Sequence, residues 1–252
     1  MKTYLIDLDG TMYRGNDQIQ GAIDFIEYCQ DKQIPFYFLT NNATRTRNEN
    51  AEHMLALGFK NIVPEQFYTS GMAAISYVSE LNQKAHAYYL GEAGLKEAFD
   101  GSNLIYDEVH PEYVLVGMDK MGNYDKYSQL LHLLLNGATL VATNDDRRLP
   151  YGNSFKIGNG AIIAMLEYAS NQTAIKIGKP HLPIIEAALS YFGLLSKDVC
   201  LIGDNLETDI QLGIKANIET IFVDSGVHSF MDIERLNINP TYQVHSLIEL
   251  ID

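Results

Sequence analysis

Short apolar runs alternate with helical patterns at both ends of this chain. The strand-like runs are 3–8, 34–40, 67–70, 198–204 and 219–226, and the helical patterns are 21–33, 46–58, 71–83, 179–193 and 208–217. Strands that alternate with helices through short connections form parallel sheets covered by helices on both faces. The two ends of the chain are therefore predicted to form halves of one α/β sheet.

Residues 83–175 separate these two blocks and carry an alternation of their own. Strand-like runs at 85–91, 112–118 and 139–145 are interspersed with helical patterns at 93–100, 124–137 and 160–170. About ninety residues are enough for an independently folded unit. The prediction is a core domain formed by 1–82 and 176–252, with a second domain of strands and helices, 83–175, inserted into it.

The charge and cysteine content limit the partners and the compartment. Lys and Arg number 18 against 32 Asp and Glu, and no basic run occurs, so we expect no nucleic-acid partner. No run of 18 apolar residues occurs, and Asp7 and Asp9 stand where a signal peptide would need its apolar region, so we expect no membrane partner either. Cys29 and Cys200 form no CxxC pair, and a cytoplasmic location is the expectation.

Polar side chains stand where the predicted strands end, or in the loops and helices that follow. They are Asp7 and Asp9 in "DLDGT", Thr40 after "IPFYFL", Lys179 in "IKIGKP", Asp204 at the end of "VCLIGD", and Asp209 five residues later. Each alone has an ordinary structural explanation, such as an Asp-Gly turn or a helix N-cap. Ligands of open parallel sheets bind beyond the carboxyl ends of the strands, so their joint occurrence predicts one functional site at this edge.

The order of these residues resembles that of the haloacid dehalogenase superfamily. DxDGT comes first, then a threonine after a second strand, then a lysine, then GDNxxTD. More narrowly, the chain resembles the NagD-like phosphatases, in which a large domain is inserted between the threonine and lysine motifs, as 83–175 is here. The resemblance covers nearly the whole chain. It implies an α/β fold in which a Rossmann-like parallel sheet core carries an inserted α/β cap domain of the C2 type.

The resemblance also implies a phosphatase that works through an aspartyl phosphate. Asp7 would be the nucleophile, and Asp9 would protonate the leaving oxygen and later accept a proton from water. Thr40 and the backbone amide of Asn41 would hydrogen-bond the phosphoryl oxygens. Lys179 would supply a positive charge to the phosphate and to Asp7.

A divalent cation is part of this expectation. A phosphate ester repels an anionic nucleophile unless positive charge offsets the charge of the phosphoryl group. By resemblance Mg²⁺ would be bound by Asp7, by the backbone carbonyl of Asp9 and by Asp204. Asp209 would hold a metal-bound water or Lys179 in place.

The substrate is expected to meet a loop of the inserted domain. In the family this loop resembles "TNPD", and here it consists of Thr143, Asn144, Asp145 and Asp146, with Asp145 in place of the proline. Asn144 and Asp146 are the expected substrate-binding residues. The expected substrates are small phosphomonoesters such as sugar phosphates, nucleoside monophosphates and, in vitro, p-nitrophenyl phosphate. The family also implies a possible homo-oligomer formed through the cap.

Other functions remain open at this point or fail on particular residues. A phosphomutase or phosphotransferase would share all four motifs, whereas a non-catalytic regulator would be expected to have lost a motif residue. "TAIKIGK" lacks the first glycine of a P-loop, and "GNGAIIA" lacks the third glycine of a dinucleotide-binding motif. "DNLETD" has Leu206 where a calcium-binding loop needs Asp or Asn. His132 is expected to be a packed or partly exposed helix residue, and no pattern gives His228 a partner.

Overall fold

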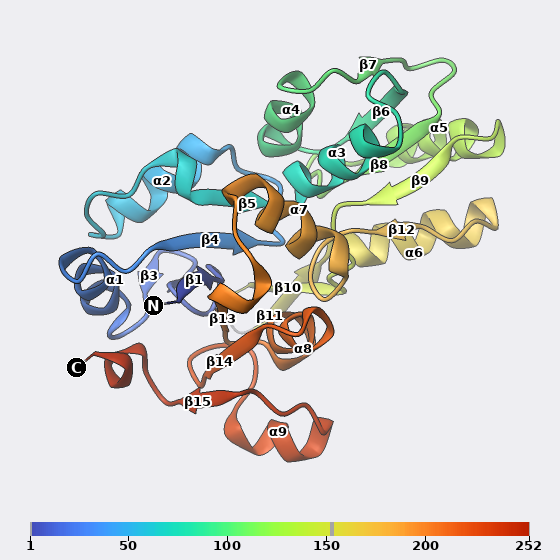
Figure 1. The fold of residues 1–252 in the computed structure, drawn as a ribbon. Coiled ribbons are helices and arrows are strands. Elements are labelled where there is room, and N and C mark those ends of the chain that lie inside the picture. Colours follow the sequence, from blue (N-terminus) through green and yellow to red (C-terminus); the bar gives the residue numbers. More distant parts are fainter. Residues whose placement is uncertain (1, 152–153, 252) are drawn as a thin grey trace. The chain divides into compact units, whose positions relative to one another are not determined.

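A computed structural model describes residues 2–151 and 154–251 of the chain (Figure 1). They form two compact units. The first comprises the chain up to Thr40, Arg47–Tyr68 and the residues from Ala188 on, and the second comprises Asn41–Thr46 and Thr69–Ala187. Each unit has a parallel sheet of its own, which confirms the predicted α/β class.

The sheet of the first unit has six strands. In spatial order they are β15 (Tyr242–Val244), β14 (Glu219–Val223), β13 (Val199–Gly203), β1 (Thr3–Ile6), β4 (Phe36–Thr40) and β5 (Phe67–Thr69). β1 pairs in parallel with both of its neighbours, and Ile6 lies opposite Ile202 of β13 and Phe38 of β4. Along the chain, β4 and β5 are added on one side of β1, and β13, β14 and β15 are added later on the other side. The carboxyl end of β1 is therefore a switch point of the topology, where open α/β sheets bind ligands.

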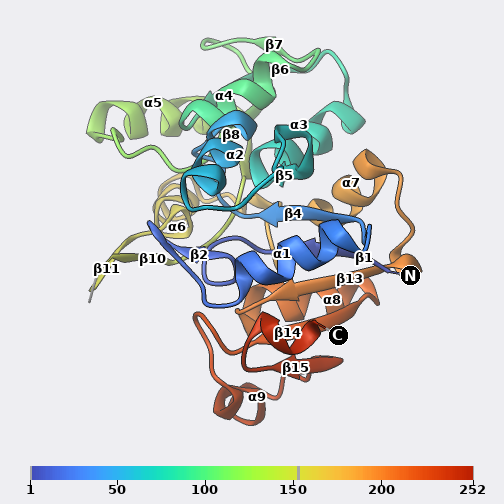
Figure 2. The ribbon, with the colours of Figure 1, turned by 90° about the vertical axis from the view of Figure 1, so that its left-hand side faces the viewer.

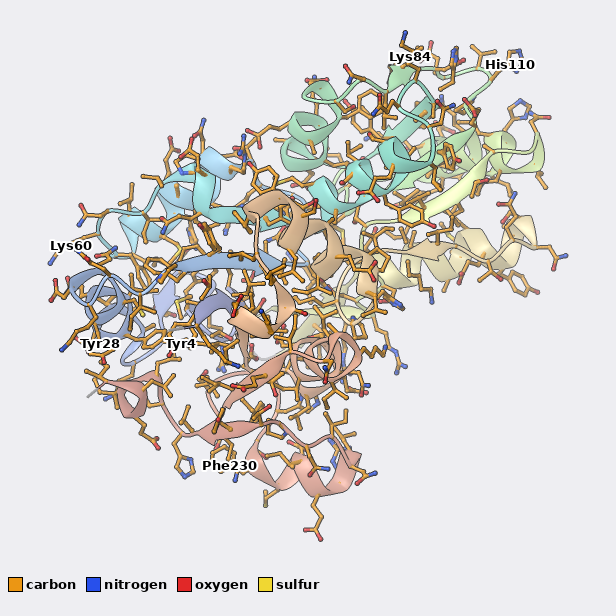
Figure 3. All side chains as sticks on the ribbon, in the orientation of Figure 1. Tyr4, Tyr28, Lys60, Lys84, His110 and Phe230 are labelled. Carbon is orange, nitrogen blue, oxygen red and sulfur yellow. The ribbon has the colours of Figure 1, made fainter. Side chains whose placement is uncertain are left out.

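Helices cover both faces of this sheet. They are α1 (Ala22–Asp31), α2 (Arg47–Ala56), α8 (Gln211–Ala216), α9 (Phe230–Leu236) and the last turns of α7 (Leu182–Phe192). Figures 1 and 2 show α1 and α8 on opposite faces. Phe25 of α1 is fully buried, and its ring centroid lies 5.6 Å from that of Tyr4, which Figure 3 labels. None of the helices in the described residues is long and apolar enough to cross a membrane.

Short elements complete the first unit. β2 (Tyr13–Arg14) and β3 (Asp17–Gln18) form a small antiparallel hairpin directly after β1. Single turns of 3₁₀ helix lie at η1 (Pro64–Gln66), η2 (Ser196–Asp198) and η4 (Leu247–Leu250). The strands, α1 and α2 pack around a large apolar cluster that contains Ile6, Phe38 and Ile202, and α9 packs on a smaller cluster that contains Phe222. This core fixes the strand ends that carry the predicted site.

Both cysteines are free and buried in the first unit, and this predicts how their thiols react. Burial is the main cause that raises the pKa of each thiol, Cys29 and Cys200, to about 12. At pH 8 the thiolate, which is the reactive form, is then only about 10⁻⁴ of each thiol. The native protein should not react with a disulfide reagent such as DTNB within minutes at pH 8, and two thiols should react once guanidinium unfolds it. Rapid labelling of the native protein would contradict the burial.

The second unit is built on five parallel strands. In spatial order they are β12 (Ile175–Lys176), β9 (Thr139–Ala142), β8 (Tyr113–Val116), β6 (His86–Leu90) and β7 (Ile105–Tyr106). Its helices are α3 (Ser70–Leu81), α4 (Ala93–Asp100), α5 (Tyr124–Leu135) and α6 (Asn159–Ser170). β10 (Arg148–Tyr151) and β11 (Ser154–Ile157) form an antiparallel hairpin before α6. Leu130, Leu133 and Ile163 of α5 and α6 lie in the apolar cluster of this unit.

The second unit is larger than the segment 83–175. It also contains α3, the loop Asn41–Thr46 and the chain from β12 to Ala187. α3 packs on α4, and the Ser70 hydroxyl at its start donates to the Asn41 carbonyl (2.6 Å). β12 pairs with β9, with Ile175 opposite Val141. The predicted domains, 1–82 with 176–252 and 83–175, are segments expected to fold independently, and these boundaries stay a prediction.

Candidate active site

Three buried carboxylates meet at the carboxyl edge of the first sheet. Asp7 directly follows β1, Asp204 follows the neighbouring strand β13, and Asp209 lies in the π-helical turn η3 (Leu206–Ile210). One oxygen from each lies within 4.8 Å of the others, and the three residues are 7%, 1% and 1% exposed. Negative charges this close repel strongly when water is excluded, and carboxylate oxygens are the ligands that hard divalent cations prefer. These three residues fit a metal ion.

The first turn after β1 and a loop near the C-terminus hold Asp204 from two sides. The Thr11 hydroxyl donates to Asp204 Oδ1 (3.0 Å), and the backbone N–H of Val227 donates to Oδ2 (2.6 Å). Burial, followed by the negative charges of Asp7 and Asp209, raises the pKa of Asp204 well above its ordinary value. A bound cation would favour the charged form of this carboxylate and oppose that shift.

Gly10 allows the turn after β1 to pass close to Asp204. Its φ is +101°, a conformation that residues with a side chain rarely adopt. A Cβ atom at this position would also overlap the carboxylate of Asp204. The glycine of "DLDGT" is therefore required both by its backbone conformation and by the space that Asp204 occupies.

Asp209 is held by the segment that follows Asp204. The backbone N–H of Asn205 donates to Asp209 Oδ2 (3.2 Å), and the N–H of Asp209 donates to the Asn205 carbonyl (2.9 Å). A Cβ atom at Gly203 would overlap the Asp209 carboxylate. The π-helical turn thus brings Asp209 back over the end of β13, beside Asp204.

Asp9 differs from Asp7 in its exposure to solvent. The chain turns sharply here, because the N–H groups of Thr11 and Met12 both donate to the Leu8 carbonyl (3.2 and 2.9 Å). Asp7 is buried at the end of the strand, whereas Asp9 is exposed on the turn. Two carboxylates only two residues apart therefore lie in different environments, and Asp9 can exchange protons with solvent.

Thr40 lies at the same edge, on the other side of β1. It is the last residue of β4, and the pairing of Phe38 with Ile6 brings it level with the residues that follow β1. The residue is buried, with 2% of its surface exposed. Of the residues predicted for the site, the first unit therefore brings together Asp7, Thr40, Asp204 and Asp209, with Asp9 on the adjoining turn.

The remaining predicted residues gather in the second unit, around the side chain of Asn41. Asn41 Oδ1 accepts the backbone N–H of Lys179 (2.7 Å), and Asn41 Nδ2 donates to the Lys179 carbonyl (3.0 Å). The same Nδ2 also donates to Asp146 Oδ1 (3.2 Å), and Asn144 Nδ2 donates to the Asn41 carbonyl (2.8 Å). The sequence predicted a role only for the backbone amide of Asn41. The two hydrogen bonds between its side chain and the Lys179 backbone were not predicted.

The loop that carries Asn144 and Asp146 is packed against the start of α6. Gly158 is the N-cap of this helix, and the N–H groups of Gly158 and Gly160 donate to the carbonyls of Arg147 and Asp146 (3.1 and 2.9 Å). Both glycines therefore lie at the start of α6, directly against the loop. Their close approach fixes the backbone of the predicted substrate loop.

Two histidines singled out from the sequence have structural partners. His132 is exposed on α5, and its Nε2 lies 3.0 Å from Asn136 Nδ2. His228 accepts the N–H of Leu206 at Nδ1 (3.1 Å), and burial lowers its pKa. No pattern in the sequence predicted that Thr11 and Val227 bond Asp204, or that His228 bonds Leu206, since these partners lie far apart along the chain.

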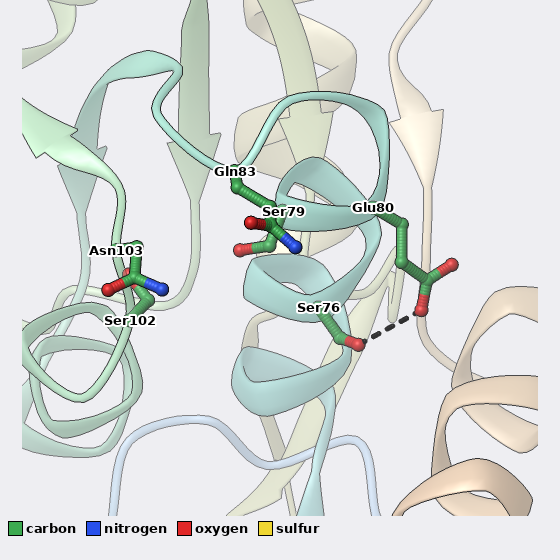
Figure 4. A pocket seen from close by; sticks show the side chains of 6 residues that line it. All are labelled: Ser76, Ser79, Glu80, Gln83, Ser102 and Asn103. Atoms are coloured by element: carbon green, nitrogen blue, oxygen red, sulfur yellow. Dashed lines mark hydrogen bonds between the residues drawn. The ribbon is translucent and has the colours of Figure 1, made fainter.

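A separate pocket lies on the second unit (Figure 4). It has a volume of about 230 Å³ and is lined by Ser76, Ser79, Glu80, Gln83, Ser102 and Asn103. Its walls come from α3 and from the turn after α4, and none of the predicted site residues lines it. It is distinct from the carboxylate group at the edge of the first sheet.

Comparisons with known proteins agree with this geometry. Residues 4–105 match the family model of the haloacid dehalogenase-like hydrolases, and residues 176–250 match a second model of the same kind. An acid sugar phosphatase of Staphylococcus aureus is 38% identical over 251 residues, which cover 99% of this chain and 96% of the relative.

Solved structures give the same result. A thermostable NPPase from Geobacillus stearothermophilus, a double mutant, is 37% identical with a TM-score of 0.91, and 99% of this chain matches 98% of that one. NagD from E. coli K-12 is 32% identical with a TM-score of 0.90, over 99% of this chain and 98% of the other. Because relatives and solved structures at 32–38% identity each match 99% of this chain, the chain belongs to the haloacid dehalogenase-like hydrolases, within their NagD-like group of phosphatases.

Proposed function

We propose that this chain is a Mg²⁺-dependent hydrolase of small phosphomonoesters that transfers the phosphoryl group to Asp7 and then to water. The observation that carries the proposal is the group of three buried carboxylates at the switch point of the first sheet. Carboxylate oxygens are the ligands that Mg²⁺ prefers, and three of them converge here from three buried residues. Membership of a phosphatase family supports the same reaction.

Asp7 and Asp9 would divide the chemistry between them. An oxygen of Asp7 attacks phosphorus, the bond from phosphorus to the ester oxygen breaks, and Asp9 gives its proton to that oxygen. Water then attacks phosphorus, Asp9 accepts a proton from it, and phosphate leaves while the Asp7 carboxylate is restored. The different environments of the two carboxylates, one buried and one exposed, support this division.

Three further residues would bind the phosphoryl oxygens. The Thr40 hydroxyl and the backbone amide of Asn41 would donate hydrogen bonds, and Lys179 would contribute a positive charge. The two hydrogen bonds from the Asn41 side chain to the Lys179 backbone support this role, because they fix the base of the lysine side chain.

Asp7, the backbone carbonyl of Asp9 and Asp204 would hold the Mg²⁺, with Asp209 supporting the site from the second layer. The bound ion would supply positive charge that reduces the repulsion between the phosphate ester and Asp7. The hydrogen bonds from Thr11 and Val227 keep Asp204 oriented for this role.

Sugar phosphates and nucleoside monophosphates are the substrates that we propose, with p-nitrophenyl phosphate as a substrate in vitro. The names of the Staphylococcus aureus and Geobacillus stearothermophilus relatives support phosphorylated sugars and aryl phosphates. Asn144 and Asp146 would contact the leaving group. We place the enzyme in the cytoplasm, where its two free cysteines would stay reduced, and a homo-oligomer formed through the cap is part of the proposal.

Phosphate release from a panel of phosphomonoesters tests this function. The panel includes p-nitrophenyl phosphate, hexose phosphates and nucleoside monophosphates, each assayed with Mg²⁺ and with EDTA. We expect release that depends on Mg²⁺, with a ranking that points to the physiological class of substrate. Transfer of phosphate between sugar phosphates without release to water would instead identify a phosphomutase or phosphotransferase, and release that is unaffected by EDTA would contradict the metal site.

A further inference from the structure

Asp145 forms two ion pairs within the second unit. Its Oδ2 lies 3.3 Å from Nε2 of His181 and 3.4 Å from Nζ of Lys176. The three side chains are 26%, 31% and 33% exposed, so each is mostly covered. The hydrogen bond from His181 is the largest cause that lowers the pKa of Asp145, and the charges of His181 and Lys176 act in the same direction. Asp145 is therefore held as a carboxylate between two basic side chains.

These ion pairs join two segments that both carry predicted site residues. Asp145 stands between Asn144 and Asp146 in the loop after β9. Lys176 is the last residue of β12, and His181 follows Lys179 by two positions. Asp145 and His181 are 36 positions apart in the sequence.

Backbone and side-chain contacts join the same two segments next to the ion pairs. The N–H of Gly178 donates to the Thr143 carbonyl (2.8 Å), which continues the pairing of β12 with β9. On the far side of Asp145, Asp146 accepts a hydrogen bond from Asn41, which also binds the Lys179 backbone. Asp145 lies between these two attachments, so its ion pairs add side-chain contacts between the same two segments.

We propose that Asp145, His181 and Lys176 are positioning residues that clamp the Asn144–Asp146 loop to the segment carrying Lys179, so that the groups binding the leaving group and the phosphate stay in fixed register. This inference rests on the proposed function and deepens it, because it assigns a role to three side chains that do not touch the reacting atoms. A proline at position 145 would restrict the backbone through its ring. In this chain the ion pairs of Asp145 would restrict the loop in its place, in addition to the hydrogen bonds of Asn144 and Asp146.

Kinetics of four variants test the clamp. They are Asp145→Ala, His181→Ala, the double variant, and Asp145→Pro, with Asp100→Ala as the matched control because it removes an exposed ion pair with Lys96 in the same unit. For p-nitrophenyl phosphate we expect Asp145→Ala and His181→Ala each to raise KM about five-fold and to change kcat less than about two-fold. The double variant should match the single ones, and Asp145→Pro should restore most of the KM.

Hydrogen exchange of the same variants decides the question independently of activity. Asp145→Ala and His181→Ala should both speed amide exchange in peptides covering 143–148 and 176–181, whereas Asp100→Ala should leave those peptides unchanged. Unchanged exchange, or KM effects of the two single variants that add in the double variant, would overturn the clamp. An inactive wild-type protein whose exchange responds as expected would contradict the proposed function and leave the clamp supported.

Discussion

Replacement of Asp7 by asparagine should abolish turnover while the protein stays folded. The amide has nearly the shape of the carboxylate but is a far poorer nucleophile, so kcat for p-nitrophenyl phosphate should fall at least about 10³-fold. The variant should stay folded, because the asparagine side chain fills the same space and can still form hydrogen bonds. Steady-state kinetics and thermal unfolding of the purified variant measure the two effects separately.

Asp224 offers a matched control for this experiment. It also follows a strand of the first sheet, β14, but it pairs with His245 (3.4 Å) and is not part of the carboxylate group. Asp224→Asn should keep kcat within about two-fold of the wild type, since substitutions away from such sites usually have small effects. If Asp7→Asn retained a tenth or more of the wild-type kcat, Asp7 would not be the nucleophile.

Replacement of Asp204 by asparagine should separate metal binding from folding. The amide can keep both hydrogen bonds of the side chain, because the Thr11 hydroxyl can accept as well as donate and the Val227 N–H can donate to the amide oxygen. Loss of one metal-binding charge should lower kcat/KM at least about 100-fold at millimolar Mg²⁺. Without Mg²⁺ the variant should be as stable as the wild type or more stable, because a buried negative charge has been removed.

The thermal midpoint with and without Mg²⁺ is the readout. A ligand present at 100 times its Kd stabilises the folded state by about 2.7 kcal/mol, so wild-type Tm should rise with added Mg²⁺. Asp204→Asn should show little or no rise, and Asp224→Asn should rise as the wild type does. A variant that gained as much stability from Mg²⁺ as the wild type would remove Asp204 from the metal site.

The carboxylate site was predictable because it rests on a general property of parallel sheets. Asp7 and Asp204 each follow a short apolar run directly, and the carboxyl ends of parallel strands share one edge. The alternation of strands and helices therefore fixed the class of the fold and the edge on which to look. The pattern could not tell which strands are neighbours, and the direct pairing of β1 with β13 comes from the structure.

Contacts between distant segments could not be read from the sequence. Thr11 reaches Asp204 across 193 positions, and Asn41 reaches Lys179 across 138. Such pairs leave no local periodicity, and an asparagine that binds a distant backbone looks like any turn residue. The ion pairs of Asp145 were hidden for the same reason, although the departure of this residue from the family's loop pointed to the position.

The extent of each unit was equally hidden. The apolar spacing of α3 and α7 shows that each helix buries one face, but not the sheet on which that face packs. In the structure α3 packs on α4 in the second unit, and α7 crosses the boundary between Ala187 and Ala188. Helical periodicity shows which face of a helix is buried, but the sheet or helix against which that face packs is set by contacts between distant parts of the chain.

The most direct test of the account is to find the phosphoryl group on Asp7. Asp9→Asn should still react with p-nitrophenyl phosphate, whose leaving group needs little protonation, but should be slow to activate water. Rapid mixing with Mg²⁺ should release close to one equivalent of p-nitrophenol per active site in a burst. Mass spectrometry after an acid quench should then locate the phosphoryl group on the peptide that contains Asp7. Turnover by this variant without a burst, or a phosphoryl group on any other residue, would contradict the mechanism.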